Sequence, residues 1–254
     1  MTRIIISGCG GKMGRVLFAC AAQREDCTVV AGVDVHTGVQ DAFPVYCSPL
    51  EIKEEADVLI DFSNPSLLPD LLAFGKKTHM PLVLCTTGYD KEQGNAVKQA
   101  AQEIPIFYSG NMSIGINLLI ELAKKAAQVL GENFDVEIIE QHHNQKIDAP
   151  SGTALMIADG VVEAENRSMH YVYDRHSQRR KRSPDEIGIH SIRGGTIVGE
   201  HAVIFAGPNE VITISHSAQS KEIFAAGALN AAVYLVGKGA GLYSMSDFIN
   251  QEGS

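Results

Sequence analysis

The chain has 254 residues, of which 45% are hydrophobic and 20% charged, as is usual for a globular protein that buries a core. The formal net charge of −9 disfavours nucleic acid as a partner, because phosphates repel an acidic protein. The longest apolar stretches, such as residues 225–236, are too short to cross a bilayer, and the apolar run at the start ends at Gly8, so neither a membrane span nor an export signal is expected. Five cysteines without a CxxC pair favour reduced thiols and a cytoplasmic location.

The first 110 residues alternate β-branched runs with helical patterns. The predicted helices begin with 13–23, and the second of them opens at Asn64-Pro65, a cap residue followed by a first-turn proline. Strands separated by helices indicate βαβ units, so we expect a Rossmann-like, doubly wound parallel sheet over residues 1–112. The predicted strands are 3–7, 28–33, 58–62, 81–84 and 104–108, and the helices are 13–23, 66–77 and 91–102.

The pattern changes after a helix predicted at 114–130. Four longer strands then share the sequence with one clear helix at 151–163, which suggests mainly antiparallel pairing. We expect residues 113–220 to form an α+β domain with a mixed sheet, and residues 221–254, with a helix at 221–236, to return to the first domain. The predicted strands of the second domain are 134–141, 187–193, 196–205 and 210–216.

A glycine-rich turn, Gly8–Gly14, joins the first strand to the first helix. Glycines permit a sharp bend and a close approach to a pyrophosphate, and the helix N-terminus offers N–H groups to that anion. A glycine-rich run by itself can be an ordinary tight turn, but its place between strand and helix favours a dinucleotide site. The residues assigned to this part of the cofactor site are Gly8, Cys9, Gly10, Gly11, Lys12 and Met13.

Asp34 follows the second predicted strand, twenty residues after Gly14, where a carboxylate can accept hydrogen bonds from the adenosine ribose. A carboxylate repels a 2′-phosphate, and no arginine follows it, which favours NADH. Lys12 and His36 could soften that preference, so the expected cofactor is NADH, NADPH or both.

Two further loops follow predicted strands, at the edge where an open parallel sheet offers a crevice for the nicotinamide half of a cofactor. Ordinary strand-to-helix turns are the alternative. Cys9 and Cys85 fit small packing residues better than nucleophiles. The loop residues assigned to the cofactor are Cys85, Thr86, Thr87, Ser109, Gly110, Asn111 and Met112.

The segment 140–155 gathers two histidines, a lysine and a helix start. Ser151 is a suitable N-cap, so the N–H groups of Gly152 and Thr153 could bind a carboxylate near Lys146. Adjacent histidines can also be a metal pair or a structural pair. Because a third metal ligand has no support in the sequence, we expect an acid/base site with an anion pocket and no metal.

Residues 175–182 hold five arginines and lysines. A solvated loop is the simplest interpretation. A loop that gathers a dicarboxylate or contacts a neighbouring subunit, and a nucleic-acid patch, are the alternatives.

These motifs together resemble those of the dihydrodipicolinate reductase family over nearly the whole chain. The His-His-x-x-Lys segment followed by Asp-Ala-Pro-Ser-Gly-Thr is specific, unlike the glycine loop alone. Val35-His36 stands where some relatives carry an arginine, and the basic segment is unusually dense. The matching runs are Gly8–Gly14, Thr86–Gly88, Asn111, Ser113–Asn117, His142–Lys146, Asp148–Ala154, Arg193–Gly195 and Gly199–His201.

The resemblance implies a cytoplasmic homotetramer that reduces 4-hydroxy-tetrahydrodipicolinate to tetrahydrodipicolinate with NAD(P)H, in the diaminopimelate route of lysine biosynthesis. It implies that His142 donates or accepts a proton and that Lys146 donates one. His143, Gly152 and Thr153 would then hold the substrate carboxylates, and the glycine loop, Asp34 and the two later loops would line the cofactor.

Two other functions would share the cofactor-binding part of this pattern. An enzyme like aspartate-semialdehyde dehydrogenase would need a cysteine nucleophile in the second half, but no cysteine follows Cys85. A non-catalytic NAD(H) sensor would keep the glycine loop but would not oxidise the cofactor.

Overall fold

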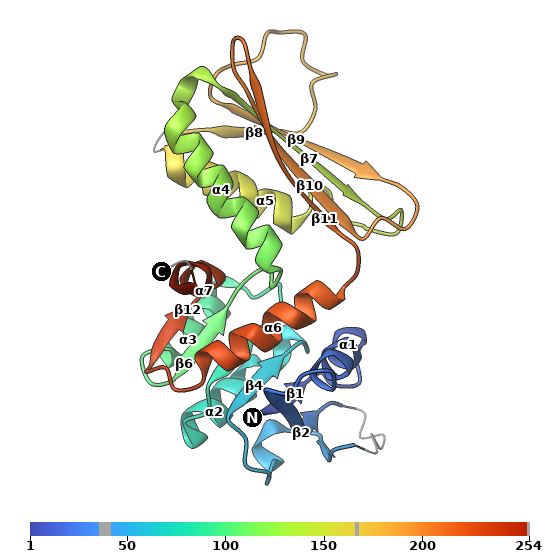
Figure 1. Cartoon of the computed structure of the whole chain (residues 1–254), viewed down its shortest axis with the longest axis vertical. Coiled ribbons are helices and arrows are strands. Elements are labelled where there is room, and N and C mark those ends of the chain that lie inside the picture. The colour runs from blue at the N-terminus through green and yellow to red at the C-terminus, as the bar shows by residue number, and fades with distance from the viewer. Residues whose placement is uncertain (36–41, 166–167, 253–254) are drawn as a thin grey trace. The chain divides into compact units, whose positions relative to one another are not determined.

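The computed structural model describes residues 1–35, 42–165 and 168–252. Two compact units are present, one formed by Met1–Ile114 with Lys221–Ser254 and the other by Gly115–Ser220 (Figure 1). Among the described residues, no helix combines the length and apolar character needed to span a membrane.

The first unit holds a seven-stranded sheet in the order β12-β6-β5-β4-β1-β2-β3, and every pairing in it is parallel. The parallel, doubly wound sheet predicted from the sequence is confirmed. Its strands are β1 (Thr2–Ser7), β2 (Cys27–Val33), β3 (Val45–Tyr46), β4 (Val58–Asp61), β5 (Leu82–Leu84), β6 (Pro105–Tyr108) and β12 (Gly241–Tyr243).

Helices cover both faces of this sheet. Alternate residues of β1 show why: Ile4 and Ile6 pack with α1, α6 and α7, whereas Ile5 packs with α2 and α3. The helices are α1 (Lys12–Ala21), α2 (Leu68–Thr78), α3 (Lys91–Ala100), α6 (Glu222–Leu235) and α7 (Met245–Glu252), with short 3-10 turns η1 (Pro49–Glu51) and η2 (Pro65–Leu67). As predicted, Asn64 caps the second helical segment, its side chain accepting a hydrogen bond from the Ser66 N–H.

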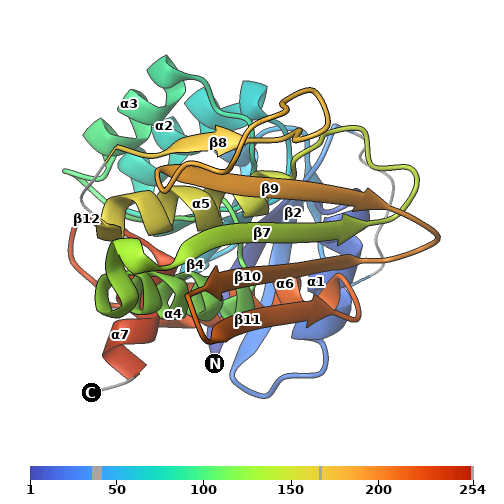
Figure 2. The same ribbon diagram turned by 90° about the horizontal axis from the view of Figure 1, so that it is seen from above.

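The second unit is a five-stranded sheet in the order β11-β10-β7-β9-β8 (Figure 2). The two pairings of β10 are antiparallel, whereas β7–β9 and β8–β9 are parallel, so the mixed sheet predicted from the sequence is confirmed, although antiparallel pairing does not predominate in it. The physical reason is the helix α5, which makes a crossover after β7 and returns the chain for parallel pairing. The elements are α4 (Ile114–Leu130), η3 (Gly131–Asn133), β7 (Asp135–His142), α5 (Gly152–Glu165), β8 (His170–Val172), β9 (Glu186–Arg193), β10 (Gly199–Ala206) and β11 (Val211–Ala218).

Helices α4 and α5 lie against one face of this sheet (Figure 1). Val136 and Ile138 of β7 point into that core together with Val203 and Phe205 of β10. Because side chains alternate along a strand, the residues between them belong to the opposite, open face.

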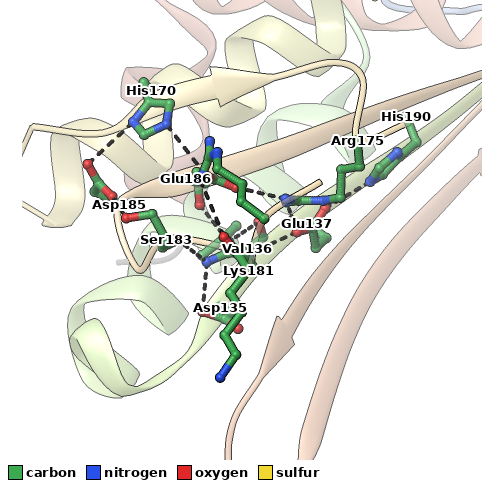
Figure 3. A network of polar contacts seen from close by, with 12 residues as sticks. Asp135, Val136, Glu137, His170, Arg175, Lys181, Ser183, Asp185, Glu186 and His190 are labelled. Atoms are coloured by element: carbon green, nitrogen blue, oxygen red, sulfur yellow. Dashed lines mark hydrogen bonds and ion pairs between the residues drawn. The ribbon is translucent and has the colours of Figure 1, made fainter. Parts of the chain in front are cut away.

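The basic segment lies in the β8–β9 loop, and three of its arginines are tied to acidic groups of the same unit (Figure 3). Arg175 and Arg180 pair with the buried carboxylate of Glu186, at 2.7 and 2.5 Å. Arg175 and Arg182 also pair with Glu137 of β7, at 2.7 and 3.0 Å. The basic segment is therefore more than a solvated loop, because these three arginines, although partly exposed, fasten it to the sheet.

Candidate active site

The glycine loop connects β1 to α1 as the sequence predicts. Gly8 has a φ of +77°, which favours glycine, and its carbonyl accepts a hydrogen bond from Gly11 N–H. A Cβ on Gly14 would lie 2.2 Å from the Gly8 carbonyl oxygen, so α1 can begin against the turn only with glycine at this position. The turn and the start of α1 thus have the close packing that a dinucleotide loop requires.

Asp34 lies directly after β2 and closes onto this loop. Its Oδ2 accepts a hydrogen bond of 2.9 Å from the Gly10 N–H. Asp34 also lines a cavity of about 290 Å³ together with Gly8 and Gly11. This is where a ribose could meet the carboxylate. His36, considered above as a modifier of cofactor preference, lies outside the described residues.

A second cavity, of about 310 Å³, opens where β5 and β6 end. Its lining includes Phe62 and Phe224, and Phe62 also lines the first cavity. The predicted cofactor residues at this cavity are Met13, Cys85, Thr87, Ser109, Gly110, Asn111 and Met112. The structure thus places the two later loops around one hollow.

Four predicted cofactor residues are not among those that line these two cavities: Cys9, Gly10, Lys12 and Thr86. Cys9 is buried, and burial raises the pKa of its thiol to about 11. Burial likewise raises the pKa of Cys85, which agrees with the interpretation of both cysteines as packing residues rather than nucleophiles.

The end of β4 supplies residues that the sequence analysis missed. Ser63 and Asn64 line the first cavity with Phe62. The buried carboxylate of Asp61 accepts hydrogen bonds from the hydroxyls of Thr86 (2.6 Å) and Ser63 (2.5 Å), joining the ends of β4 and β5. The rule that ligands bind at the carboxyl ends of parallel strands points to this loop, whereas Asn64-Pro65 by itself indicates only a helix start.

In the second unit, the predicted catalytic segment begins at the end of β7 and runs to the start of α5. His142 is the last residue of β7, and Gly152 is the first residue of α5. The Ser151 hydroxyl accepts a hydrogen bond from Ala154 N–H, the capping contact expected of it. A Cβ on Gly152 would meet no described atom within 4 Å, so the first turn of the helix is open to an approaching group.

His142 is held by a glutamate that sequence reasoning did not assign to the site. Its Nδ1 lies 2.6 Å from Oε2 of Glu140, two residues earlier on the same strand. Desolvation lowers the pKa of His142, although the hydrogen bond that it makes to the Glu140 carboxylate acts in the opposite direction. His142 is therefore mainly neutral at pH 7.

Arg193, at the end of β9, is the counter-charge of Glu140. Its Nη2 donates to Glu140 Oε1 at 2.7 Å and its Nη1 to Oε2 at 2.9 Å, a bidentate pair. Arg193 also donates to the backbone carbonyl of Asp148 at 2.7 Å. The parallel register places Arg193 opposite His142, so β9 brings this charge to the end of β7.

His201 of β10 completes the cluster. Its ring centroid lies 5.3 Å from that of His142, and its Nε2 lies 3.1 Å from the Ser151 hydroxyl oxygen. Burial lowers the pKa of His201 to about 4, so this ring stays neutral at pH 7.

Lys146 extends from the loop that follows β7. Its Nζ pairs with the Asp148 carboxylate at 2.9 Å, and this hydrogen bond lowers the pKa of Asp148. His143 lies in the same loop, and its backbone carbonyl accepts a hydrogen bond from Lys146 N–H. The loop therefore holds a positive charge between His142 and the start of α5.

The described residues contain no group of three or more histidine, cysteine, aspartate and glutamate side chains arranged to hold a metal ion. What the second unit does offer is a histidine held by a carboxylate, a lysine and the N-terminus of α5 within one stretch of chain.

Two family models together match almost the whole chain. The one described as "Dihydrodipicolinate reductase, N-terminus" matches residues 2–112, and the one described as "Dihydrodipicolinate reductase, C-terminus" matches residues 115–249. The chain belongs to the dihydrodipicolinate reductase family.

Similar proteins agree with this family. A curated relative from Caldanaerobacter subterraneus subsp. tengcongensis, named 4-hydroxy-tetrahydrodipicolinate reductase, is 56% identical over 99% of both chains. A relative of the same name from Clostridium tetani is 48% identical over 98% of both chains. The structure of a dipicolinate-bound dihydrodipicolinate reductase from Paenisporosarcina sp. TG-14 matches with a TM-score of 0.81 at 26% identity, covering 98% of this chain and 99% of that one.

Proposed function

We propose that this chain reduces 4-hydroxy-tetrahydrodipicolinate to tetrahydrodipicolinate with a nicotinamide cofactor, in the diaminopimelate route of lysine biosynthesis. The observation that carries the proposal is the 56% identity, over 99% of both chains, to a relative named for this activity. The dipicolinate in the similar solved structure, a small cyclic dicarboxylate, agrees with the substrate class.

The chemistry of this reduction matches the groups in the second unit. Loss of water from the 4-hydroxy compound gives a conjugated C=C–C=N ring, hydride adds at the carbon end, and the electron pair moves toward nitrogen. One proton must then neutralise that charge, which suits a histidine or lysine. In this scheme His142 donates or accepts a proton, Lys146 donates one, and His143, Gly152 and Thr153 bind the carboxylates.

The first unit, with its glycine loop, is the dinucleotide-binding domain in this proposal. When NADH or NADPH is bound there, the cofactor supplies the hydride. Cofactor contacts are assigned to Gly8–Met13, Asp34, Cys85–Thr87 and Ser109–Met112. Asp34 favours NADH, because a carboxylate that faces the ribose repels the additional phosphate of NADPH. We expect NADH to be used at least as well as NADPH.

The second unit is assigned to substrate binding and to assembly of a homotetramer. The open face of its sheet carries an apolar set that would be covered by other copies of the chain. By strand alternation and register this set comprises Ile139, Ile192, Ala202, Ile204 and Val211.

The test is the fall in absorbance of NADH, and separately of NADPH, when the purified chain meets dihydrodipicolinate freshly generated by a coupled synthase. Rapid oxidation is expected, with kcat/KM for NADH equal to or above that for NADPH. A preference of tenfold or more for NADPH would contradict the role of Asp34. Cofactor binding without oxidation would instead favour the NAD(H) sensor.

A further inference from the structure

Glu140 occupies an unusual position for a carboxylate, because its side chain is fully buried on the helix-covered face of the second sheet. A buried charge is tolerated only where hydrogen bonds and an opposite charge compensate the loss of water. Both oxygens of Glu140 are compensated. Oε1 accepts from Arg193 and from the Ser151 N–H at 3.1 Å, and Oε2 accepts from Arg193 and faces Nδ1 of His142.

These contacts fix the charge state of Glu140. Burial by itself would raise the pKa of this carboxyl group, but hydrogen bonds, that of Arg193 above all, lower it to about 2. Glu140 is consequently ionised throughout the range in which an enzyme works, and an ionised carboxylate can only accept hydrogen bonds.

The charge state of Glu140 in turn decides which nitrogen of His142 carries the proton. Because Oε2 can only accept, the Nδ1 atom 2.6 Å away must be the donor. Neutral His142 therefore has its hydrogen on Nδ1 and its lone pair on Nε2. Any proton that His142 takes up or gives away is the one on Nε2.

The surroundings of Nε2 agree with this assignment. A Cβ on Gly199, the first residue of β10, would lie 3.2 Å from Nε2 of His142. The absence of a side chain at Gly199 leaves space beside the nitrogen that exchanges the proton.

We propose that Glu140 is a positioning residue that, clamped by Arg193, holds His142 in the Nδ1–H form with Nε2 available for proton transfer, and that links this histidine through the Ser151 N–H to the start of α5. The role of His142 in the reduction rests on the proposed function. The ring form of His142 and its contact with Glu140 do not depend on that function.

The first test uses the unmodified protein. Nitrogen NMR of ¹⁵N-histidine-labelled full-length chain at about pH 8, above the ordinary histidine pKa, distinguishes the two ring forms. The signals of His142 are assigned by their loss in His142→Gln. The expected result is a protonated Nδ1 and an unprotonated Nε2. The opposite form would overturn the proposal, whatever the activity of the enzyme.

The second test is kinetic. In Glu140→Gln, the side-chain NH₂ group has two possible orientations. If it faces His142, it donates to Nδ1 and favours the ring form with the proton on Nε2. If it faces Arg193, two hydrogen-bond donors oppose each other. We expect kcat to fall on the order of 10²-fold, the lower end of what an acid/base group contributes, while the KM for NADH is unchanged. Glu140→Asp keeps the charge and should recover part of the loss.

The pH profile separates positioning from a merely structural effect. Charged or titratable groups that act on His142 are Glu140 from β7, Arg193 from β9, Lys146 from the following loop and His201 from β10. Glu140 raises the pKa of His142, so its removal lowers that pKa, and the limb of the pH–rate profile that reports His142 moves to lower pH. A fall in kcat with an unmoved limb would contradict the proposal.

Glu186→Gln is the matched control. Glu186 is also fully buried and paired with arginines of the same unit, but it pairs with Arg175, Arg180 and His170 rather than with His142. It should leave kcat and the pH limb unchanged. An equal loss of kcat in both variants would mean that removing the charge of any buried carboxylate in this unit lowers turnover, and it would overturn the positioning role of Glu140. If the unmodified chain oxidises no cofactor, the proposed function fails, and the NMR result still decides the ring form.

Discussion

In the second unit, the charge of a buried residue is compensated by a residue that is distant in sequence. Glu140 would be a costly buried carboxylate without Arg193, which lies 53 residues later in the chain. Lys146 differs, because it is partly exposed and its partner Asp148 lies in the same loop. An exposed ion pair of this kind contributes little to stability, so substitution of Lys146 is suited to a test of chemistry rather than of folding.

Lys146→Ala should lower kcat by about 10²–10⁴-fold while the Kd for NADH stays the same, because a proton donor is removed and the predicted cofactor residues are untouched. Steady-state kinetics with calorimetric cofactor binding measure both quantities. The matched control is Lys125→Ala, an exposed lysine on α4, which should have normal turnover. Turnover close to normal in Lys146→Ala would remove it from the proposed mechanism.

At the level of elements, the junction of β1 with α1 and the β8–β9 loop are held in different ways. The first depends on close backbone packing, because Gly14 lies against the Gly8 carbonyl. The second depends on ion pairs, in which Arg175 and Arg182 reach Glu137 on β7. Packing of this kind tolerates no added atom, and this makes glycine substitutions informative.

Gly14→Ala should weaken NADH binding by tenfold or more and lower the melting temperature, because the added methyl group would meet backbone atoms 2.2 and 2.6 Å away. Gly94→Ala is the control: it lies inside α3, where a Cβ would meet no described atom within 4 Å. Alanine is the better helix former by about 1 kcal/mol, so this variant should be equally or more stable. Thermal unfolding and NADH titration of both variants decide the matter. Normal NADH affinity in Gly14→Ala would argue against the glycine loop as the pyrophosphate site.

At the level of the whole molecule, the open face of the second sheet is the surface to which we assign tetramer assembly. Its residues Ile192 and Val211 are 45% and 63% exposed in the single chain. Burial of such side chains between copies would contribute about 25 cal/mol for each Å² of apolar surface removed from water.

Ile204→Glu, in the middle of that face, should dissociate the assembly into smaller species, because a buried unpaired carboxylate is strongly unfavourable. Light scattering coupled to size-exclusion chromatography measures the mass. Val129→Glu on α4, where the valine is 70% exposed, is the matched control and should keep the assembly of the unmodified chain. A mass unaffected by Ile204→Glu would place the interface elsewhere.

The local sequence pattern was sufficient to predict the features that depend on residues close together in the chain. The parallel strands β1, β2, β4, β5 and β6 follow from short apolar runs, and the cap at Ser151 follows from its side chain and the helix after it. The strands β3, β8 and β12 are no longer than β5, but they lack its uninterrupted aliphatic run, so the local pattern does not reveal them. They exist because a neighbouring strand offers them hydrogen bonds.

The candidate site divides in the same way. His142, Lys146 and the start of α5 lie within one stretch, so the sequence by itself could nominate them together. Glu140 and His142 lie two residues apart on one face of β7, so their contact needs only the strand itself. That Arg193 neutralises Glu140 was decided by the register of β7 against β9, and the ion pairs of three arginines of the basic segment were decided by the fold of the β8–β9 loop. Pairing between distant strands is set by the packing of the whole unit rather than by local propensity, and only the tertiary structure could reveal which charges meet.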